Sequence, residues 1–328
     1  MALPRPQLAD IEAAAARLAG HAVRTPLLEA PLLNEILGGR LLVKPECLQL
    51  TGSFKFRGAY NKISGLDEEA RRKGVLAYSS GNHAQGVAAA ARMFGILAVI
   101  VMPSDAPAIK IANTRAWGAE VVTYDRHGTS REALAQGIAR ERGLTLVPPY
   151  DDPAIIAGQG TVGLEIAQDC LARGVTPDAA VICCGGGGLS SGSAIALSAH
   201  LPGISLHTAE PAGWDDTARS LAAGERLANE GVVPSLCDAL LAPTPGELTF
   251  PINRDLMHSG AAVDDDEVVA AMLAANRHFK LVAEPGGAAA LAAVLSGKVP
   301  VAGRTVVVVI SGGNVDPATY GELIGRAR

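Results

Sequence analysis

The stretch VICCGGGGLSSGSA, residues 181–194, places four consecutive glycines between an apolar run and a run of small residues. The apolar residues 181–184 predict the end of a buried strand, and the residues from Leu189 onward predict a helix. Glycines let the backbone approach an anion closely, and the free N–H groups at the start of a helix attract negative charge. The stretch therefore predicts a strand, a loop and a helix of an α/β protein, with an anion site at the loop. An ordinary glycine-rich turn is the alternative for this motif taken alone.

The predicted anion site differs from the common nucleotide-binding motifs. Residues 181–194 lack the lysine of a G-x-x-x-x-G-K-[ST] loop and the spaced glycines of a G-x-G-x-x-G loop. ATP and NAD are therefore disfavoured, and we expect a phosphate group on another kind of ligand.

Strand-like segments alternate with helical patterns on both sides of this unit, which implies parallel sheets joined by right-handed crossovers. The least periodic region, residues 225–257, is expected to run over the surface. Residues 264–279 begin with acids and predict an amphipathic helix. Seven segments have the composition of strands: 75–80, 97–103, 120–125, 144–150, 179–184, 204–210 and 305–311.

The composition narrows the class of protein and its partners. A chain of 328 residues is long enough for one large domain or two closely packed ones. A formal net charge of -5 and an aromatic content of 4% argue against nucleic acid and anionic membranes as partners. The five cysteines show neither a disulfide framework nor zinc-ligand spacing. Asp10 and Glu12 lie where a signal peptide would need an apolar core, so a cytoplasmic location is expected.

Two further junctions between a strand and a following segment carry polar side chains. AYSSGNHAQG, residues 77–86, places serines, Asn82 and His83 at a helix start, where N–H donors would suit a carboxylate substrate. A simple helix cap by Ser80 or Asn82 is the alternative. VVVVISGGNVD, residues 306–316, ends an apolar strand at Ser311. Because ligands of open α/β sheets bind at the carboxyl ends of strands, all three junctions are expected to face one crevice.

A fourth motif, SFKFRGA at residues 53–59, places Lys55 between two of the five phenylalanines of the chain. Together with SSGNHAQG, GGGGL and SGGN, in this order, it resembles the pyridoxal-phosphate enzymes of the tryptophan synthase β (fold type II) family, in the threonine/serine dehydratase and serine racemase branch. The resemblance covers nearly the whole chain. It implies two open, mostly parallel α/β sheets with helices on both faces. Pyridoxal phosphate would lie in the cleft between a large domain, residues 1–50 and 147–328, and a small domain, residues 51–146.

The resemblance also implies which residues hold the cofactor. Lys55 would bind pyridoxal phosphate covalently, because an amine between apolar neighbours is desolvated and becomes a better nucleophile. A surface lysine with a buried stem is the alternative for Lys55 taken alone. Phe54 would pack on the ring, Asn82 would meet the ring hydroxyl and Ser311 would meet the pyridine nitrogen. The phosphate would be held by Gly185, Gly186, Gly187, Gly188 and Leu189.

By the same resemblance, the substrate carboxylate would be held by Ser79, Ser80, Asn82 and His83, and Tyr150 would contact the substrate. Ser80 would also be a second catalytic base beside Lys55, on the opposite face of the ring, which would permit racemisation. Arg131 would face a second carboxylate of the substrate, or would be an exposed helix arginine.

The implied activity is dehydration and deamination of a 3-hydroxy amino acid such as L-threonine or L-serine to a 2-oxo acid and ammonia. Serine racemase and threo-3-hydroxyaspartate dehydratase are the alternatives, and a sensor that binds pyridoxal phosphate or an amino acid is the non-enzymatic one. A homodimer is expected.

AEPAGWDD, residues 209–216, resembles the divalent-cation site of the same branch. Glu210, Asp216 and the carbonyl of Trp214 would be the protein ligands of Mg²⁺ or Ca²⁺, both of which prefer oxygen donors. A helix start capped by Asp215 or Asp216 is the alternative.

Overall fold

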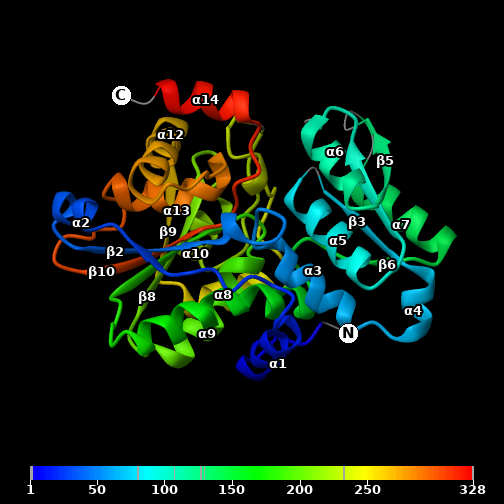
Figure 1. Ribbon diagram of the computed structural model, residues 1–328, viewed down its shortest axis with the longest axis horizontal. Helices are drawn as coiled ribbons and strands as arrows, with labels where there is room; N and C mark the ends of the chain where they lie inside the picture. The colour runs from blue at the N-terminus through cyan, green and yellow to red at the C-terminus, as the bar shows by residue number, and fades with distance from the viewer. Residues whose placement is uncertain are drawn as a thin grey trace.

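Two mainly parallel sheets form two halves of the molecule that lie side by side (Figure 1). The computed structural model describes residues 3–79, 81–106, 108–125, 128, 130–231 and 233–326. Within this part of the chain the strands are β1 Leu28–Glu29, β2 Arg40–Pro45, β3 Val75–Tyr78, β4 Ala98–Pro103, β5 Glu120–Tyr124, β6 Thr145–Leu146, β7 Ala179–Cys183, β8 Ser205–Pro211, β9 Ser259–Val263 and β10 Thr305–Ile310.

The helices surround both sheets. The α-helices are α1 Leu8–Leu18, α2 Pro31–Leu37, α3 Lys55–Ser64, α4 Glu68–Lys73, α5 Asn82–Met93, α6 Ala108–Ala116, α7 Arg131–Arg142, α8 Pro153–Ala172, α9 Gly188–His200, α10 Asp216–Ala223, α11 Thr249–Leu256, α12 Asp265–Ala274, α13 Pro285–Leu295 and α14 Pro317–Arg326. Short 3-10 helices span η1 Glu46–Leu48 and η2 Asp238–Leu240, and a π-helix spans η3 Ala275–Phe279. No helix in the described ranges has the length and apolar character needed to cross a membrane.

The larger sheet has the strand order β1-β2-β10-β7-β8-β9, and the smaller has the order β5-β4-β3-β6. Strand β1 pairs with β2 in the antiparallel sense, and the other described pairings are parallel. We call the larger sheet with α1, α2 and α8 to α14 the large half, and the smaller sheet with α3 to α7 the small half. Helix α3 packs against both α5 and α8, so it connects the two halves.

Both faces of each sheet are covered by helices, so successive residues of a strand enter different hydrophobic cores. In β10, Val307 and Val309 belong to a core with residues of α8 and α9, whereas Val306 and Val308 belong to a core with residues of α12 and α13. Both faces of the strand are buried, so its sequence is an unbroken apolar run rather than an alternating one. The small sheet repeats the arrangement, with α5 on one face and α7 on the other.

The predicted fold class is confirmed, and all seven predicted strand segments contain a strand. Strands β1, β2 and β9 were not predicted. The expectation that residues 225–257 run over the surface is wrong in part, because η2 and α11 lie in this region and Phe250, Ile252 and Leu240 are buried. The strands of the small sheet all fall within residues 75–146; the proposed domain boundaries remain a prediction.

Candidate active site

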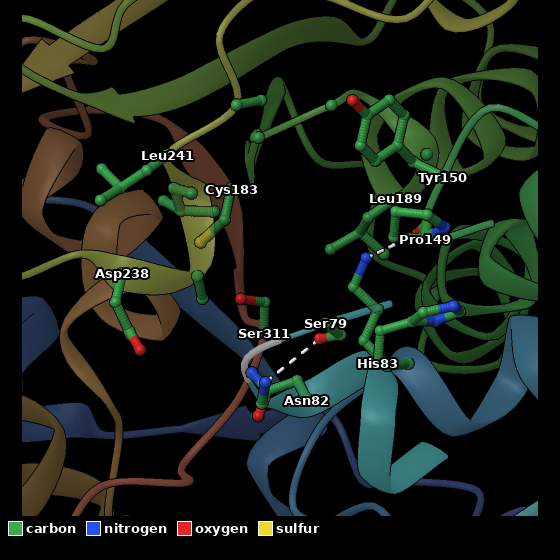
Figure 2. Close-up of a pocket in the computed structure, with 18 of the residues that line it drawn as sticks. Ser79, Asn82, His83, Pro149, Tyr150, Cys183, Leu189, Asp238, Leu241 and Ser311 are labelled. Atoms are coloured by element: carbon green, nitrogen blue, oxygen red, sulfur yellow. Dashed lines mark hydrogen bonds between the residues drawn. The ribbon is translucent and has the colours of Figure 1, made fainter. Parts of the chain in front are cut away.

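A pocket lies where the carboxyl ends of β3, β7 and β10 come together (Figure 2). The loops that follow these strands supply Ser79, the glycines at 185–188 and Ser311, so the three predicted junctions do face one cavity. The predicted site residues that line it are Phe54, Lys55, Ser79, Asn82, His83, Tyr150, Gly185, Gly186, Gly187, Gly188, Leu189 and Ser311. Ser80, the predicted second base, lies outside the described residues.

Lys55 is the first residue of α3, and its side chain reaches into the pocket. The Nζ atom donates a hydrogen bond to the carbonyl oxygen of Pro149 at 2.7 Å and lies 5.1 Å from the centroid of the Phe54 ring. Burial lowers the pKa of Lys55 to about 8, because the charged amine is poorly solvated there. Near physiological pH Lys55 therefore has a larger fraction of neutral amine than an ordinary lysine, which makes it a better nucleophile and base.

Arg57 fixes the first turn of α3 through a buried ion cluster. Its guanidinium contacts Glu46 at 2.7 Å and Glu165 at 2.7 Å, and Lys44 contacts Glu165 at 2.6 Å. Arg57, Glu46 and Lys44 are fully buried. The cluster therefore ties α3 to β2, η1 and α8 two residues after Lys55.

The glycine loop is shaped as a cradle for an anion. Among the described residues, no acceptor is hydrogen-bonded to the backbone N–H groups of Gly186, Gly187 and Gly188 at the start of α9. A Cβ atom at Gly186 would lie 2.3 Å from the ring of Tyr150, and Gly187 has a φ of 92°, which strongly favours glycine. The chain thus keeps several N–H donors free beside the pocket, and side chains at these positions would fill the space.

The second junction offers neutral polar groups rather than charges. The N-cap of α5 is Gly81, without a side-chain cap, so the alternative of a simple cap by Asn82 is wrong. The Nε2 atom of His83 lies 2.9 Å from the carbonyl oxygen of Val147. Burial, with a smaller contribution from Lys55, lowers the pKa of His83 to about 3. The imidazole is therefore neutral and its Nε2–H donates to Val147. Its buried Nδ1 has no hydrogen-bond partner within the described ranges.

Ser311 closes the pocket at the end of β10. Its backbone N–H donates to Gly287 and its carbonyl accepts from Phe54, each at 3.2 Å. Figure 2 shows the Ser311 side chain directed into the cavity, near Cys183.

Sequence reasoning missed several residues that line the pocket: Tyr78, Gly81, Lys110, Pro149, Cys183, Asp238, Ala239, Leu240, Leu241 and Ala242. Residues 238–242 come from the aperiodic region, which carries no sequence signal for a site. Arg131 also lines the pocket, with its guanidinium 5.7 Å from the centroid of the Tyr78 ring. Its side chain is 41% exposed, as expected of an exposed helix arginine, and its contact with a second carboxylate of the substrate stays a prediction.

The predicted cation ligands lie apart from the pocket lining, at the end of β8 and the start of α10. Asp215 forms no side-chain cap; instead the Glu210 carboxylate accepts from the N–H groups of Thr217 and Ala218 at 3.0 and 2.7 Å. Burial, and then Asp216, raise the pKa of Glu210 well above its ordinary value, and burial raises the pKa of Asp216 to about 6. The buried Oδ2 of Asp216 has no hydrogen-bond partner in the part of the chain that the structure describes. No cluster of three His, Cys, Asp or Glu side chains suited to a metal occurs in the described ranges, so the predicted site has two carboxylates.

Comparisons with known proteins show which proteins the whole chain resembles. L-threo-3-hydroxyaspartate ammonia-lyase of a Pseudomonas sp is 42% identical over 315 residues, which cover 96% of this chain and 97% of the relative. The crystal structure of a threonine deaminase from T.th. has 44% identity and a TM-score of 0.89, and covers 95% of this chain and 99% of its own. The structure of maize serine racemase has 37% identity and a TM-score of 0.91, and covers 98% of each chain. The family model described as pyridoxal-phosphate dependent enzyme matches residues 18–312, and the chain therefore belongs to the pyridoxal-phosphate dependent enzymes.

Proposed function

We propose that this chain converts a 3-hydroxy amino acid such as L-threonine or L-serine to a 2-oxo acid and ammonia by β-elimination of water. The observation that carries the proposal is the Lys55 amine, whose pKa burial lowers to about 8, in a pocket that also contains the free N–H groups of the glycine loop. Relatives named as ammonia-lyases support the reaction class.

The residues of the pocket fit pyridoxal phosphate. Lys55 would hold it covalently, the N–H groups at residues 185–189 would bind its phosphate, and Phe54 would lie against its ring. Asn82 would meet the ring hydroxyl, and the hydroxyl of Ser311 would meet the ring nitrogen. When bound, the cofactor supplies an electron sink for the bond that breaks at the substrate α-carbon.

The chain itself would position the substrate and move its protons. The start of α5, with Ser79, Asn82 and His83, would bind the substrate carboxylate, because the N–H groups at a helix start attract an anion. His83 is neutral, so it adds no charge of its own to this site. Once the amine of the substrate has displaced Lys55 from its covalent bond, the neutral amine of Lys55 would remove the α-proton, and the resulting ammonium would protonate the departing β-hydroxyl. Water is lost in this step. The released enamine becomes an imine and hydrolyses to the 2-oxo acid and ammonia.

A substrate panel tests the proposal. L-threonine, L-serine, 3-phenylserine and the diastereomers of 3-hydroxyaspartate would be assayed for 2-oxo acid and for D-amino acid. We expect 2-oxo acid to dominate and Lys55→Ala to abolish it. Predominant D-serine would support the racemase instead, and cofactor binding without any turnover would support a sensor.

A second candidate, threo-3-hydroxyaspartate, is favoured by one observation. Arg131 lines the pocket, where its guanidinium can pair with a second carboxylate of the substrate. Arg131→Gln would then raise the KM for 3-hydroxyaspartate much more than the KM for L-threonine. Arg142→Gln, on the same helix but outside the pocket lining, is the matched control.

A further inference from the structure

The side-chain amide of Asn82 lies within a chain of hydrogen bonds that crosses between the two halves. Asn314 Nδ2 donates to Asn82 Oδ1 at 2.8 Å, and Asn82 Nδ2 donates to Glu284 Oε1 at 2.5 Å. Asn82 begins α5 of the small half, whereas Glu284 precedes α13 and Asn314 follows β10 in the large half. Two segments of the large half therefore hold one side chain of the small half.

The direction of these hydrogen bonds is set at the Asn314 end. Asn314 Nδ2 also donates to the carbonyl oxygen of Thr51 at 2.8 Å, and a carbonyl can only accept. Both N–H groups of Asn314 are thus used, so Asn82 must present its oxygen to Asn314. With its oxygen turned to Asn314, the Asn82 amide presents its nitrogen to Glu284, whose Oε1 accepts. One N–H of Asn82 is left over, and Asn82 lines the pocket.

Close backbone packing holds the two end groups in place. Gly52 has a φ of 71°, and a Cβ there would lie 2.6 Å from Asn314 Oδ1. A Cβ at Gly312 would lie 2.1 Å from Glu284 Oε1. Glu284 is only 1% exposed and its N–H donates to Gly312 at 3.1 Å. Its second carboxylate oxygen is buried and has no hydrogen-bond partner among the residues that the structure describes. A buried carboxylate with one side-chain partner is costly, which indicates a role beyond packing.

We propose that Glu284 and Asn314 are positioning residues that orient the Asn82 amide, so that its remaining N–H points at the ring hydroxyl of bound pyridoxal phosphate. The inference rests on the proposed role of Asn82. It does not depend on which amino acid is the substrate.

The test measures cofactor binding without substrate. Apo-protein would be titrated with pyridoxal phosphate, and both the Kd and the visible absorbance maximum would be recorded for Glu284→Ala, Asn314→Ala, Glu284→Gln and Asn82→Ala. Glu284→Ala and Asn314→Ala should each raise the Kd about tenfold, the effect of one lost hydrogen bond, and shift the absorbance maximum as Asn82→Ala does. Glu284→Gln should restore both, because its amide oxygen still accepts from Asn82.

The matched controls come from α2 and β1, outside the pocket lining. Asn34 Nδ2 donates to Glu29 Oε1 at 2.9 Å, and Asn34 Oδ1 accepts from Leu41 at 2.8 Å, so the same pair of groups is bonded in the same direction. Glu29→Ala and Asn34→Ala should leave the Kd and the spectrum unchanged. A Glu284→Ala protein that behaves like these controls would overturn the proposal, as would Glu284→Gln failing to restore the spectrum.

The two proposals fail in different ways. If Asn82→Ala shifts the spectrum and neither Glu284→Ala nor Asn314→Ala does, the positioning role alone is wrong. If Asn82→Ala changes nothing, the role of Asn82 is wrong and the positioning role falls with it. If the Glu284→Ala protein does not fold, Asn314→Ala tests the same hydrogen bonds to Asn82 from their other end.

Discussion

Lys55 combines two features that rarely occur together in a lysine side chain. Its amine donates to one carbonyl in the described part of the chain, that of Pro149, and no carboxylate there offsets the burial that lowers its pKa. Burial without a counter-charge disfavours the ammonium, so the neutral amine is more populated than in an ordinary lysine. The residue is therefore prepared for nucleophilic attack before any ligand arrives.

This environment predicts how cofactor capture depends on pH. Only the neutral amine attacks, so the rate at which apo-protein binds pyridoxal phosphate should rise with pH through about 8, the lowered pKa of Lys55. The ordinary lysine value is 10.5, and Nα-acetyl-lysine in solution is the matched control. Stopped-flow absorbance between about pH 6 and pH 11 measures both. A protein profile that keeps rising to the solution midpoint would show that Lys55 is not desolvated.

At the scale of elements, one ion pair connects the small half to the large half beside the pocket. Lys110 of α6 contacts Asp238 of η2 at 2.6 Å, and both residues line the pocket. The Lys110 side chain is 9% exposed and the Asp238 side chain 43%, so the pair is partly screened by solvent.

Asp238→Asn should weaken this connection and raise the KM for the preferred amino acid. We expect about a two- to fivefold increase, since a partly exposed ion pair contributes up to about 1 kcal/mol. Added salt should raise the KM of the wild-type protein and affect the variant less. Glu120→Gln, which breaks the exposed Glu120–Arg142 pair in the small half, is the control. Equal KM values for Asp238→Asn and this control would exclude a role of the Lys110–Asp238 pair in substrate binding.

Helices and strands are best predicted from the sequence where a single local pattern, such as an apolar run or a helix cap, marks the element. The apolar run of β10 and the capped start of α12 at Asp264 follow such rules, and both are found. Strand β2 was missed because Lys44 interrupts its apolar pattern, and that charge is buried only because Glu165, far along the chain, pairs with it. Strand β9 is made of small residues with little strand preference, and Gly260 is needed because a Cβ there would lie 2.5 Å from Ala218.

The same limit applies to the site. Lys55 and the glycine loop have local motifs and were predicted. Glu284 and Asp238 were missed because their roles arise from contacts with Asn82 and Lys110, which are distant in sequence.

At the scale of the whole molecule, the buried ion cluster around Arg57 should dominate the response to acid. Burial alone would raise the pKa of Glu46, but the contacts with Arg57 lower it below its ordinary value of 4.5. A lowered carboxyl pKa gives stability that is present above about pH 4.5 and is lost as pH falls through the folded value.

Arg57→Met should therefore destabilise the protein by about 3–5 kcal/mol, because it leaves two carboxylates without their shared partner. Urea unfolding at neutral pH measures this loss. The variant should also lose less stability between about pH 5 and pH 3 than the wild type does. Arg24→Met, which removes an exposed ion pair with Asp169, is the control, and a similar change in both variants would contradict the assignment.

The carboxylates at the end of β8 predict the opposite pH response. Folding raises the pKa of Asp216 from 3.8 to about 6, so without a cation the fold loses stability as pH rises through this range. Mg²⁺ or Ca²⁺ would bind the deprotonated pair and should raise the melting temperature by roughly 3 °C at about pH 8 and less at about pH 5. EDTA should reverse the increase. Asp216→Asn should abolish the increase. A melting temperature that changes with neither the cation nor EDTA would rule out the site.

The position of β10 in the larger sheet sets an order of assembly during synthesis. This strand, residues 305–310, lies between β2, residues 40–45, and β7, residues 179–183. The strands of the small sheet have all left the ribosome once residue 146 has emerged, so that sheet can form early. A nascent chain that stops before residue 305 would hold a finished small sheet beside a large sheet divided in two. It would also lack Ser311 and Asn314, so the pocket becomes complete only after every described strand of both sheets has been made, shortly before α14.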